Sequence, residues 1–172
     1  MQKIILVGYM GSGKSTIGKL LAEKTGIPFF DLDEMIEKNT QKTISELFFE
    51  MGEIQFRKLE HKTLIDFMAI HQYYVLSLGG GTPCYANNHL QLQKEDVVSV
   101  YLKGSNGELI NRLAPQKKHR PLIAHQSDEE LHEFIAKHLF DRSYFYHQSK
   151  HTVSVDGKNP DAVADEIKEL LT

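Results

Sequence analysis

The segment Gly8–Ser15, which reads GYMGSGKS, decides the fold because it matches the phosphate-binding pattern G-x-x-x-x-G-K-[ST] at every fixed position. The apolar run Ile4–Val7 precedes it and predicts a buried strand. Lys14–Lys24 follows with a helical pattern that Gly26 ends. In this setting glycines let successive N–H groups point at phosphate oxygens, and the helix N-terminus adds its positive dipole end. The sequence therefore predicts a P-loop and a nucleotide-binding domain.

Two residues of this loop have distinct expected roles. Lys14 can bring a full positive charge to the β- and γ-phosphates, and Ser15 places a hydroxyl where Mg²⁺ sits in such sites. We therefore expect Lys14 to be catalytic, Ser15 to be a metal ligand and Mg²⁺ to be the cofactor. The residues expected to bind ATP here are Gly11, Ser12, Gly13, Lys14, Ser15 and Thr16.

Strand-like and helical segments alternate along the rest of the chain, which is typical of a parallel α/β sheet. The further strands are expected at Pro28–Phe30, Tyr73–Leu78, Val97–Leu102 and Thr152–Val155. Helices are expected from Thr43 to Gly52, at Glu53–Ile70, at Asn106–Leu113, from Ser127 to about Gln148 and from Asn159 onward. The pattern predicts one domain over residues 1–172, a five-stranded parallel sheet flanked by helices.

Composition narrows the class of partner. No apolar run approaches the roughly 20 residues that span a bilayer. The formal net charge is −3, whereas polynucleotide binders usually carry a basic excess. The single cysteine, Cys84, cannot form an internal disulfide, which fits a reducing compartment. We expect a cytoplasmic monomer that binds small molecules, with neither nucleic acid nor membrane as a partner.

Asp31 and Asp33 follow the second predicted strand, at the end of a parallel sheet where ligands bind. If the segment is extended, both carboxylates share one face and Leu32 takes the other. Asp31 would then help to hold the metal, and Asp33 would accept a hydrogen bond and a proton from an attacking hydroxyl. The plainer interpretation is that an aspartate caps the helix that follows.

Three consecutive glycines, Gly79, Gly80 and Gly81, follow the third predicted strand. They permit close approach of the backbone to a ligand, and a tight turn alone seldom requires three. We therefore expect them to line the acceptor site.

Two arginines lie on apolar helical stripes. Arg57 shares a face with Ile54, Leu64 and Met68, and Arg142 continues a stripe of leucine and isoleucine in the later helix. A guanidinium in such a place needs an anionic partner. For Arg57 an intrahelical ion pair with Glu53 or Glu60 is the plainer alternative to an anionic substrate.

The segment Ala114–His125 breaks the pattern with two prolines and a basic cluster, and it predicts a mobile lid. A lid can exclude water and carry Arg120 to the developing charge, although a solvated arginine is the simpler interpretation. Arg112 either caps the preceding helix or stacks on adenine.

A P-loop alone permits a kinase, a GTPase or a motor ATPase. The guanine-reading motif N-K-x-D of GTPases is absent, because residues 158–161 read KNPD, and the chain has no room for a motor's extra domain. A small-molecule kinase remains.

Taken in order, these motifs resemble the shikimate kinase family from about Lys3 to Pro160. The resemblance rests on Gly8–Ser15, Asp31-Leu32-Asp33, Gly52-Glu53, Phe56-Arg57 with Glu60, Gly79–Gly81, Arg120-Pro121-Leu122, and Arg142 with Tyr146.

The resemblance implies a fold of nucleoside-monophosphate-kinase type with a mobile lid. It also implies ATP-dependent phosphorylation of the shikimate 3-hydroxyl in aromatic amino-acid biosynthesis. Asp33 would bind the shikimate hydroxyls, Arg57 and Arg142 its carboxylate, and Gly79–Gly81 its pocket. Arg120 would act from the lid, and Arg112 would border the adenine.

Two positions depart from the family pattern. Lys158 stands where the family often has an arginine near the adenine, and a lysine cannot stack as a guanidinium does, although we retain it as an ATP contact. Lys150 stands where a small residue is usual.

Two other functions compete with this one. A gluconate kinase or another small-metabolite kinase shares the P-loop, but we would not expect its Asp-Leu-Asp and triple glycine together with this arginine pair. A nucleotide-binding regulatory module should have lost Lys14 or Asp33, and both are present.

Overall fold

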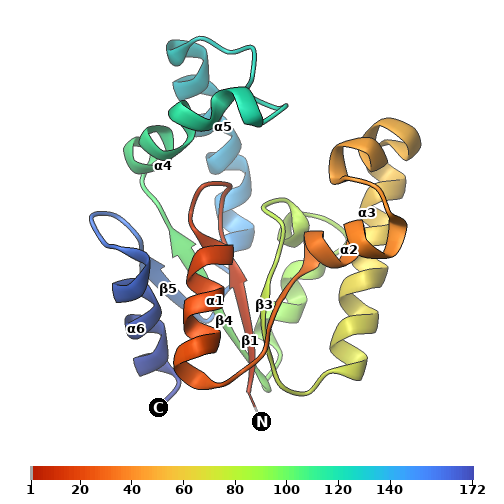
Figure 1. Ribbon diagram of the computed structural model, residues 1–172, viewed down its shortest axis with the longest axis vertical. Helices are drawn as coiled ribbons and strands as arrows, with labels where there is room; N and C mark the ends of the chain where they lie inside the picture. The colour runs from red at the N-terminus through yellow and green to blue at the C-terminus, as the bar shows by residue number, and fades with distance from the viewer. Residues whose placement is uncertain (1) are drawn as a thin grey trace.

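The computed structural model describes residues 2–172 and shows a five-stranded parallel sheet flanked by helices (Figure 1). The order across the sheet is β2-β3-β1-β4-β5. The strands are β1 (Lys3–Val7), β2 (Phe29–Asp31), β3 (Tyr74–Ser77), β4 (Val97–Lys103) and β5 (His151–Ser154). The fold class and all five strands predicted from the sequence are confirmed, with small shifts at the strand ends.

The first strand lies at the centre of the sheet. Ile4 pairs in parallel register with Val75 of β3 on one side and with Val98 of β4 on the other. Both faces of β1 are covered, so Ile4–Val7 is fully buried and reads as a continuous apolar run. The centre of the sheet therefore holds the strand that leads directly into the P-loop.

The helices are α1 (Lys14–Thr25), α2 (Leu32–Thr40), α3 (Ile44–Ile70), α4 (Asn106–Leu113), α5 (Asp128–Tyr146) and α6 (Pro160–Leu170). Short 3₁₀ segments lie at Thr82–Cys84, Asn88–Gln93 and Ala114–His119.

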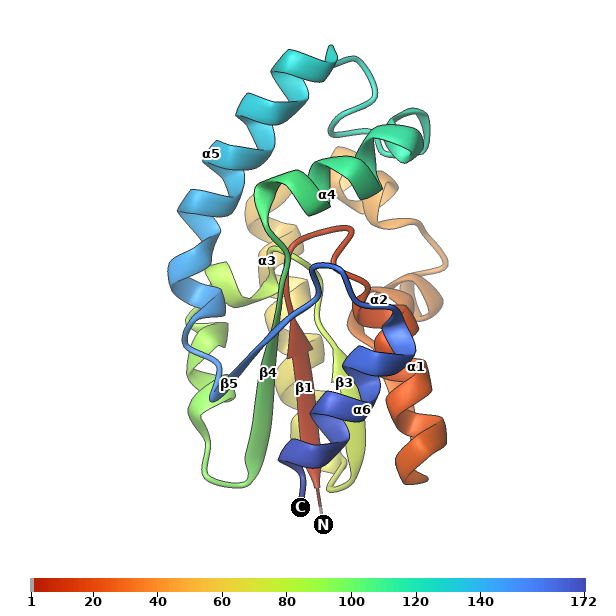
Figure 2. The same ribbon diagram turned by 90° about the vertical axis from the view of Figure 1, so that its left-hand side faces the viewer.

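Alternate residues of β1 divide between two apolar cores. Ile4 and Leu6 pack with α1 and α6, which lie side by side over one face of the sheet (Figures 1 and 2). Ile5 and Val7 point to the other face, into the core that holds the buried side chains of α3, α4 and α5. This alternation fixes which helices stand beside the P-loop.

Gly52 divides α3 into the two helical segments that the sequence predicts. Its φ of 76° is non-helical and lies where glycine is favoured, so the chain kinks there. Thr43 and Glu46 form the capping box that starts the first segment. The second segment then carries Arg57 toward the end of β3.

One local prediction is wrong. The segment from Asp31 to Asp33 is not extended throughout, because Asp31 caps α2 and Asp33 lies in the first turn of that helix. Within the segment Ala114–His125, Ala114–His119 forms a 3₁₀ helix and Ile123 is fully buried, and its role as a mobile lid stays a prediction. Within residues 2–172, no helix is both long and apolar enough to cross a membrane.

Candidate active site

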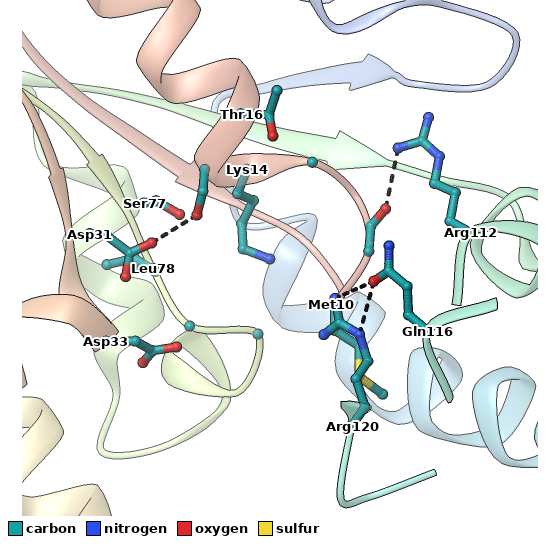
Figure 3. A pocket seen from close by; sticks show the side chains of 15 residues that line it. Met10, Lys14, Thr16, Asp31, Asp33, Ser77, Leu78, Arg112, Gln116 and Arg120 are labelled. Carbon is teal, nitrogen blue, oxygen red and sulfur yellow. Dashed lines mark hydrogen bonds between the residues drawn. The ribbon is translucent and has the colours of Figure 1, made fainter. Parts of the chain in front are cut away.

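A cavity of about 500 Å³ opens at the carboxyl ends of the central strands (Figure 3). P-loop residues form one wall, the start of α2 and the glycine segment after β3 form another, and α4 with the 3₁₀ segment after it forms a third. Of the predicted site residues, the cavity is lined by Gly11, Gly13, Lys14, Ser15, Thr16, Asp31, Asp33, Gly79, Gly80, Arg112 and Arg120.

The P-loop has the open curvature that a phosphate cradle requires. Gly11 and Gly13 have φ angles of 81° and 93°, values that glycine adopts without strain. Lys14 Nζ donates to the carbonyl oxygens of Gly8 at 2.7 Å and Tyr9 at 3.2 Å. Burial lowers the pKa of Lys14 to about 8, against the opposing effect of the Asp33 and Asp31 carboxylates. The lysine is therefore held against the loop with its charge beside the cavity.

Ser15 and Asp31, the two predicted metal ligands, are in direct contact, while a metal site here stays a prediction. Ser15 Oγ donates to Asp31 Oδ2 at 2.9 Å, and Asp31 Oδ1 accepts from the backbone N–H of Glu34 at 3.1 Å. Asp31 thus caps α2 with one oxygen and faces the P-loop with the other. Both the functional and the capping interpretation of this aspartate are consistent with its contacts.

Asp33 lies across the cavity from the P-loop (Figure 3). Its carboxyl has a pKa raised to about 6, mainly by burial and also by the neighbouring carboxylates of Asp31 and Glu60, while Lys14 opposes the rise. A carboxylate with a pKa near neutrality can accept a proton from a hydroxyl and release it again. Its position and its pKa suit a general base.

Each of the three consecutive glycines faces a different predicted acceptor-site side chain. A Cβ at Gly79 would lie 2.9 Å from Asp33 Oδ1, and one at Gly80 would lie 3.3 Å from Arg142 Nη1. A Cβ at Gly81 would lie 2.6 Å from Arg57 Nη2. Any larger residue would push against these groups. The triple glycine therefore lets a carboxylate and two guanidiniums converge on one short stretch of backbone.

Arg57 lies in an aromatic and acidic setting. Its guanidinium lies 4.1 Å from the ring centre of Tyr85, and Nη1 donates to Glu60 Oε1 at 2.9 Å. Glu60 is 1% exposed and also accepts from Thr82 Oγ1 at 2.8 Å. The ion pair with Glu60, the plainer alternative for this arginine, is thus present. The predicted shared face with Ile54 is wrong, because that side chain is 75% exposed.

Arg142 reaches the same place from α5. It is partly buried, and its guanidinium lies against Gly80, the neighbour of the glycine that Arg57 faces. The buried Tyr146, one turn further along α5, donates from its hydroxyl to the Gly80 carbonyl at 2.6 Å. Arg57 and Arg142 therefore flank one stretch of backbone from two different helices.

Arg112 connects three backbone segments beside the P-loop. Its Nη1 donates to the carbonyl oxygens of Gly11 and Ser12 at 3.2 and 3.3 Å, and Nε donates to Glu108 at 2.9 Å. Its Nη2 donates to the carbonyl oxygen of Val155. Arg112 thus ties α4 to the P-loop and to the turn after β5.

The remaining predicted nucleotide residues have separate settings. Arg120 lines the cavity, and its Nη2 donates to Gln116 Oε1 at 3.1 Å (Figure 3). Ser12 is fully buried behind the loop. Lys158 does not line the cavity, and its Nζ contacts Glu166 at 2.6 Å. An adenine contact by Lys158 stays a prediction.

Sequence reasoning missed several residues of the site. Met10, Ser77, Leu78 and Gln116 line the cavity, and Tyr85 covers Arg57. Leu78 directly precedes the triple glycine and Met10 lies inside the P-loop, so their adjacency was a usable signal. Gln116 and Tyr85 lie in segments without periodicity, and the sequence contains no signal that would have identified them.

A phosphate cradle, a hydroxyl beside a carboxylate, a buried base and two converging guanidiniums suit phosphate transfer to a small hydroxylated anion. These features and the fold define a P-loop kinase that acts on a small metabolite.

Comparison with known proteins identifies the family. The family model described as shikimate kinase matches residues 10–172. The shikimate kinase of Flavobacterium psychrophilum is 52% identical over 171 residues and that of Phocaeicola vulgatus 42% over 156 residues. The first match covers 99% of this chain and 99% of the relative. The second covers 91% of this chain and 88% of the relative. The chain belongs to the shikimate kinase family, and its reaction is the phosphorylation of shikimate by ATP.

Solved structures agree with this assignment. The crystal structure of the shikimate kinase from Bacteroides thetaiotaomicron superposes with a TM-score of 0.90 at 36% identity, over 99% of this chain and 98% of the other. The shikimate kinase from Acinetobacter baumannii in complex with shikimate gives 0.86 at 31% identity, over 99% and 93%. The predicted family, fold and activity are confirmed.

Proposed function

We propose that Asp33, Arg57 and Arg142 form the acceptor site that holds shikimate, within a single domain spanning residues 1–172. The observation that carries this proposal is the triple glycine, since each glycine makes room for one of the three side chains. Two guanidiniums that face adjacent glycines suit one carboxylate. Asp33 then lies beside the hydroxyl groups of the same molecule and serves as base for the 3-hydroxyl.

The donor side rests on the P-loop. Lys14 and the loop N–H groups bind the ATP phosphates, and Arg112 and Lys158 border the nucleotide. Arg120 approaches the transferred phosphate from the lid at residues 114–125. Its bond to Gln116 holds the guanidinium at the cavity wall in the present arrangement.

Ser15 and Asp31 fit a Mg²⁺ ion that accompanies ATP. Their two oxygens lie 2.9 Å apart at the cavity, and Mg²⁺ prefers oxygen ligands, commonly one or two carboxylates together with substrate phosphates. When bound, such an ion neutralises phosphate charge. We also propose that the protein acts as a monomer in the cytoplasm, in keeping with its single thiol, Cys84.

Titration of shikimate into Arg57→Ala and Arg142→Ala tests the acceptor site. Loss of one hydrogen bond to a charged group costs about 1.5–3 kcal/mol, which is roughly a ten- to hundredfold weaker Kd. Arg57→Lys should also be impaired, because an ammonium cannot reproduce a bidentate fork. ATP affinity should stay within about twofold in each variant. Wild-type shikimate affinity in folded Arg57→Ala and Arg142→Ala would refute the proposed site.

A further inference from the structure

One face of α5 carries three functional side chains at four-residue spacing, His138, Arg142 and Tyr146, so they stand in one row. The two outer members bind loops that belong to the cavity wall. His138 Nδ1 shares a hydrogen bond of 2.9 Å with the hydroxyl of Tyr9, and the hydroxyl of Tyr146 donates to the Gly80 carbonyl. Arg142 lies between these two attachments.

Tyr9 belongs to the P-loop, but its side chain points away from the phosphate cradle. The residue is 1% exposed, and its ring meets the His138 ring edge-on with centroids 5.4 Å apart. Its backbone carbonyl accepts from Lys14 Nζ at 3.2 Å. One residue thus contacts the catalytic lysine through its backbone and the helix that carries Arg142 through its side chain.

Both partners of this hydrogen bond are uncharged near neutral pH. Burial and the nearby Arg142 guanidinium lower the pKa of His138 to about 4, and burial raises the pKa of Tyr9 above its usual range. A neutral imidazole and a neutral phenol form a directional bond without adding charge beside Arg142. The contact can therefore fix the distance between the P-loop and α5 without adding a charge to the acceptor site.

We propose that the Tyr9–His138 hydrogen bond is a positioning contact that sets where Arg142 meets the carboxylate of the acceptor. This inference rests on the proposed role of Arg142. Two considerations support this role. The segment at residues 114–125, the proposed lid, leads directly into α5, so a movement of the lid would act on the helix that carries Arg142. Arg142 Nη1 lies so close to Gly80 that an added Cβ would be 3.3 Å away, so the guanidinium has a defined place against this backbone.

The simpler alternative is that Tyr9 only fills the core. Tyr9→Phe keeps the ring and removes the hydroxyl, so packing alone predicts no selective effect on either ligand. A positioning role predicts an unusual pattern, in which a P-loop side chain changes the affinity for the acceptor and leaves that for the nucleotide intact.

The experiment measures the shikimate Kd and the ATP Kd by calorimetry for Tyr9→Phe, His138→Phe and His138→Asn. Without the hydrogen bond, shikimate affinity should fall roughly three- to tenfold, the effect of one neutral hydrogen bond, and ATP affinity should change less than about twofold. His138→Asn keeps a polar atom near the Nδ1 position and should recover most of the loss. Unchanged shikimate affinity in both phenylalanine variants would overturn the proposal.

Matched controls remove a buried hydroxyl and an imidazole elsewhere. Tyr74→Phe deletes a buried hydroxyl that has no hydrogen-bond partner among residues 2–172, and His132→Phe alters an exposed position of α5. Neither should change the shikimate Kd. If Tyr74→Phe weakens shikimate binding as much as Tyr9→Phe, the effect is general loosening and the proposal is wrong.

The Arg142→Ala background separates this inference from the proposed acceptor site. There, adding Tyr9→Phe should change the shikimate Kd by less than about twofold, because the residue being positioned is gone. A full additive loss would show that Tyr9 acts by another route and would overturn the inference alone. If Arg142→Ala itself binds shikimate normally, the acceptor site fails and this inference fails with it.

Discussion

Replacing Gly81 with alanine changes the proposed acceptor site without changing any of its polar groups. The added Cβ would lie 2.6 Å from Arg57 Nη2 and 2.9 Å from Nη1, whereas ordinary contacts begin near 3.4 Å. The guanidinium must therefore retreat by about 0.8 Å. Its retreat is restricted by the 2.9 Å ion pair with Glu60 and by the Tyr85 ring, whose centre is 4.1 Å away.

The expected result is a selective loss of shikimate affinity. A displacement of this size removes one charge-assisted hydrogen bond, worth about 1.5–3 kcal/mol, so the Kd should rise roughly ten- to a hundredfold. The φ of Gly81 is −92°, which alanine adopts freely, so stability should fall only by what Arg57 loses in its contacts with Glu60 and Tyr85. ATP affinity should remain within about twofold.

Calorimetric titration and thermal melts together decide the outcome. Gly107→Ala is the matched control, because a Cβ there meets nothing within 4 Å, and alanine in a helix adds roughly 0.5–1 kcal/mol of stability. If Gly81→Ala binds shikimate like the wild type while Arg57→Ala does not, the close approach of Gly81 has no part in binding. A melting temperature many degrees lower would show instead that the backbone had moved.

Four further predictions follow from the groups at the cavity. Lys14→Ala should lower kcat at least about a hundredfold in a folded protein, since it removes the charge that faces the transferred phosphate; single-turnover kinetics measure this. The pH profile of kcat/KM for shikimate should fall below about pH 6 as Asp33 takes up a proton, and that for ATP should fall above about pH 8 as Lys14 loses one; flat profiles would contradict these assignments. Because folding raises the pKa of Asp33 from 3.8 to about 6, this carboxyl lowers the stability of the folded state progressively as pH rises from about 4 to about 6, so Asp33→Asn should raise the melting temperature at pH 7 and lose that gain toward pH 4. Amide exchange across Ala114–His125 should slow when nucleotide and shikimate are added together, and unchanged exchange would remove its role as a lid.

The sheet was predictable because parallel strands buried on both faces leave a strong local signal. Ile4–Val7 is a continuous apolar run, and each later strand is bounded by glycine, proline or a helical pattern. The failure at Asp31–Asp33 has a physical cause. Two aspartates around a leucine suit both an alternating strand and a helix cap, and in the structure Asp31 Oδ1 accepts from the backbone N–H of Glu34 and so caps α2.

The triple glycine at Gly79–Gly81 shows which part of the site the sequence could predict and which part it could not. Its composition indicated close approach of some group to the backbone, but not which group approached each glycine. That assignment needs the relative placement of α2, α3 and α5, which arises from packing in the shared core. The contact between His138 and Tyr9 joins residues 129 positions apart and has no local sequence signal at all.

The central place of β1 has a consequence for how the chain is made. Lys3–Val7 is synthesised before the other four strands of the sheet, yet its two neighbours are β3 at Tyr74–Ser77 and β4 at Val97–Lys103. During synthesis, both edges of this apolar strand therefore stay unpaired until β3 has left the ribosome. One edge then stays unpaired until β4 has also left it. Non-local pairing of this kind folds slowly and leaves strand edges open to other chains. The nascent chain should depend most on chaperones, or on slow translation, between the appearance of β1 and that of β4.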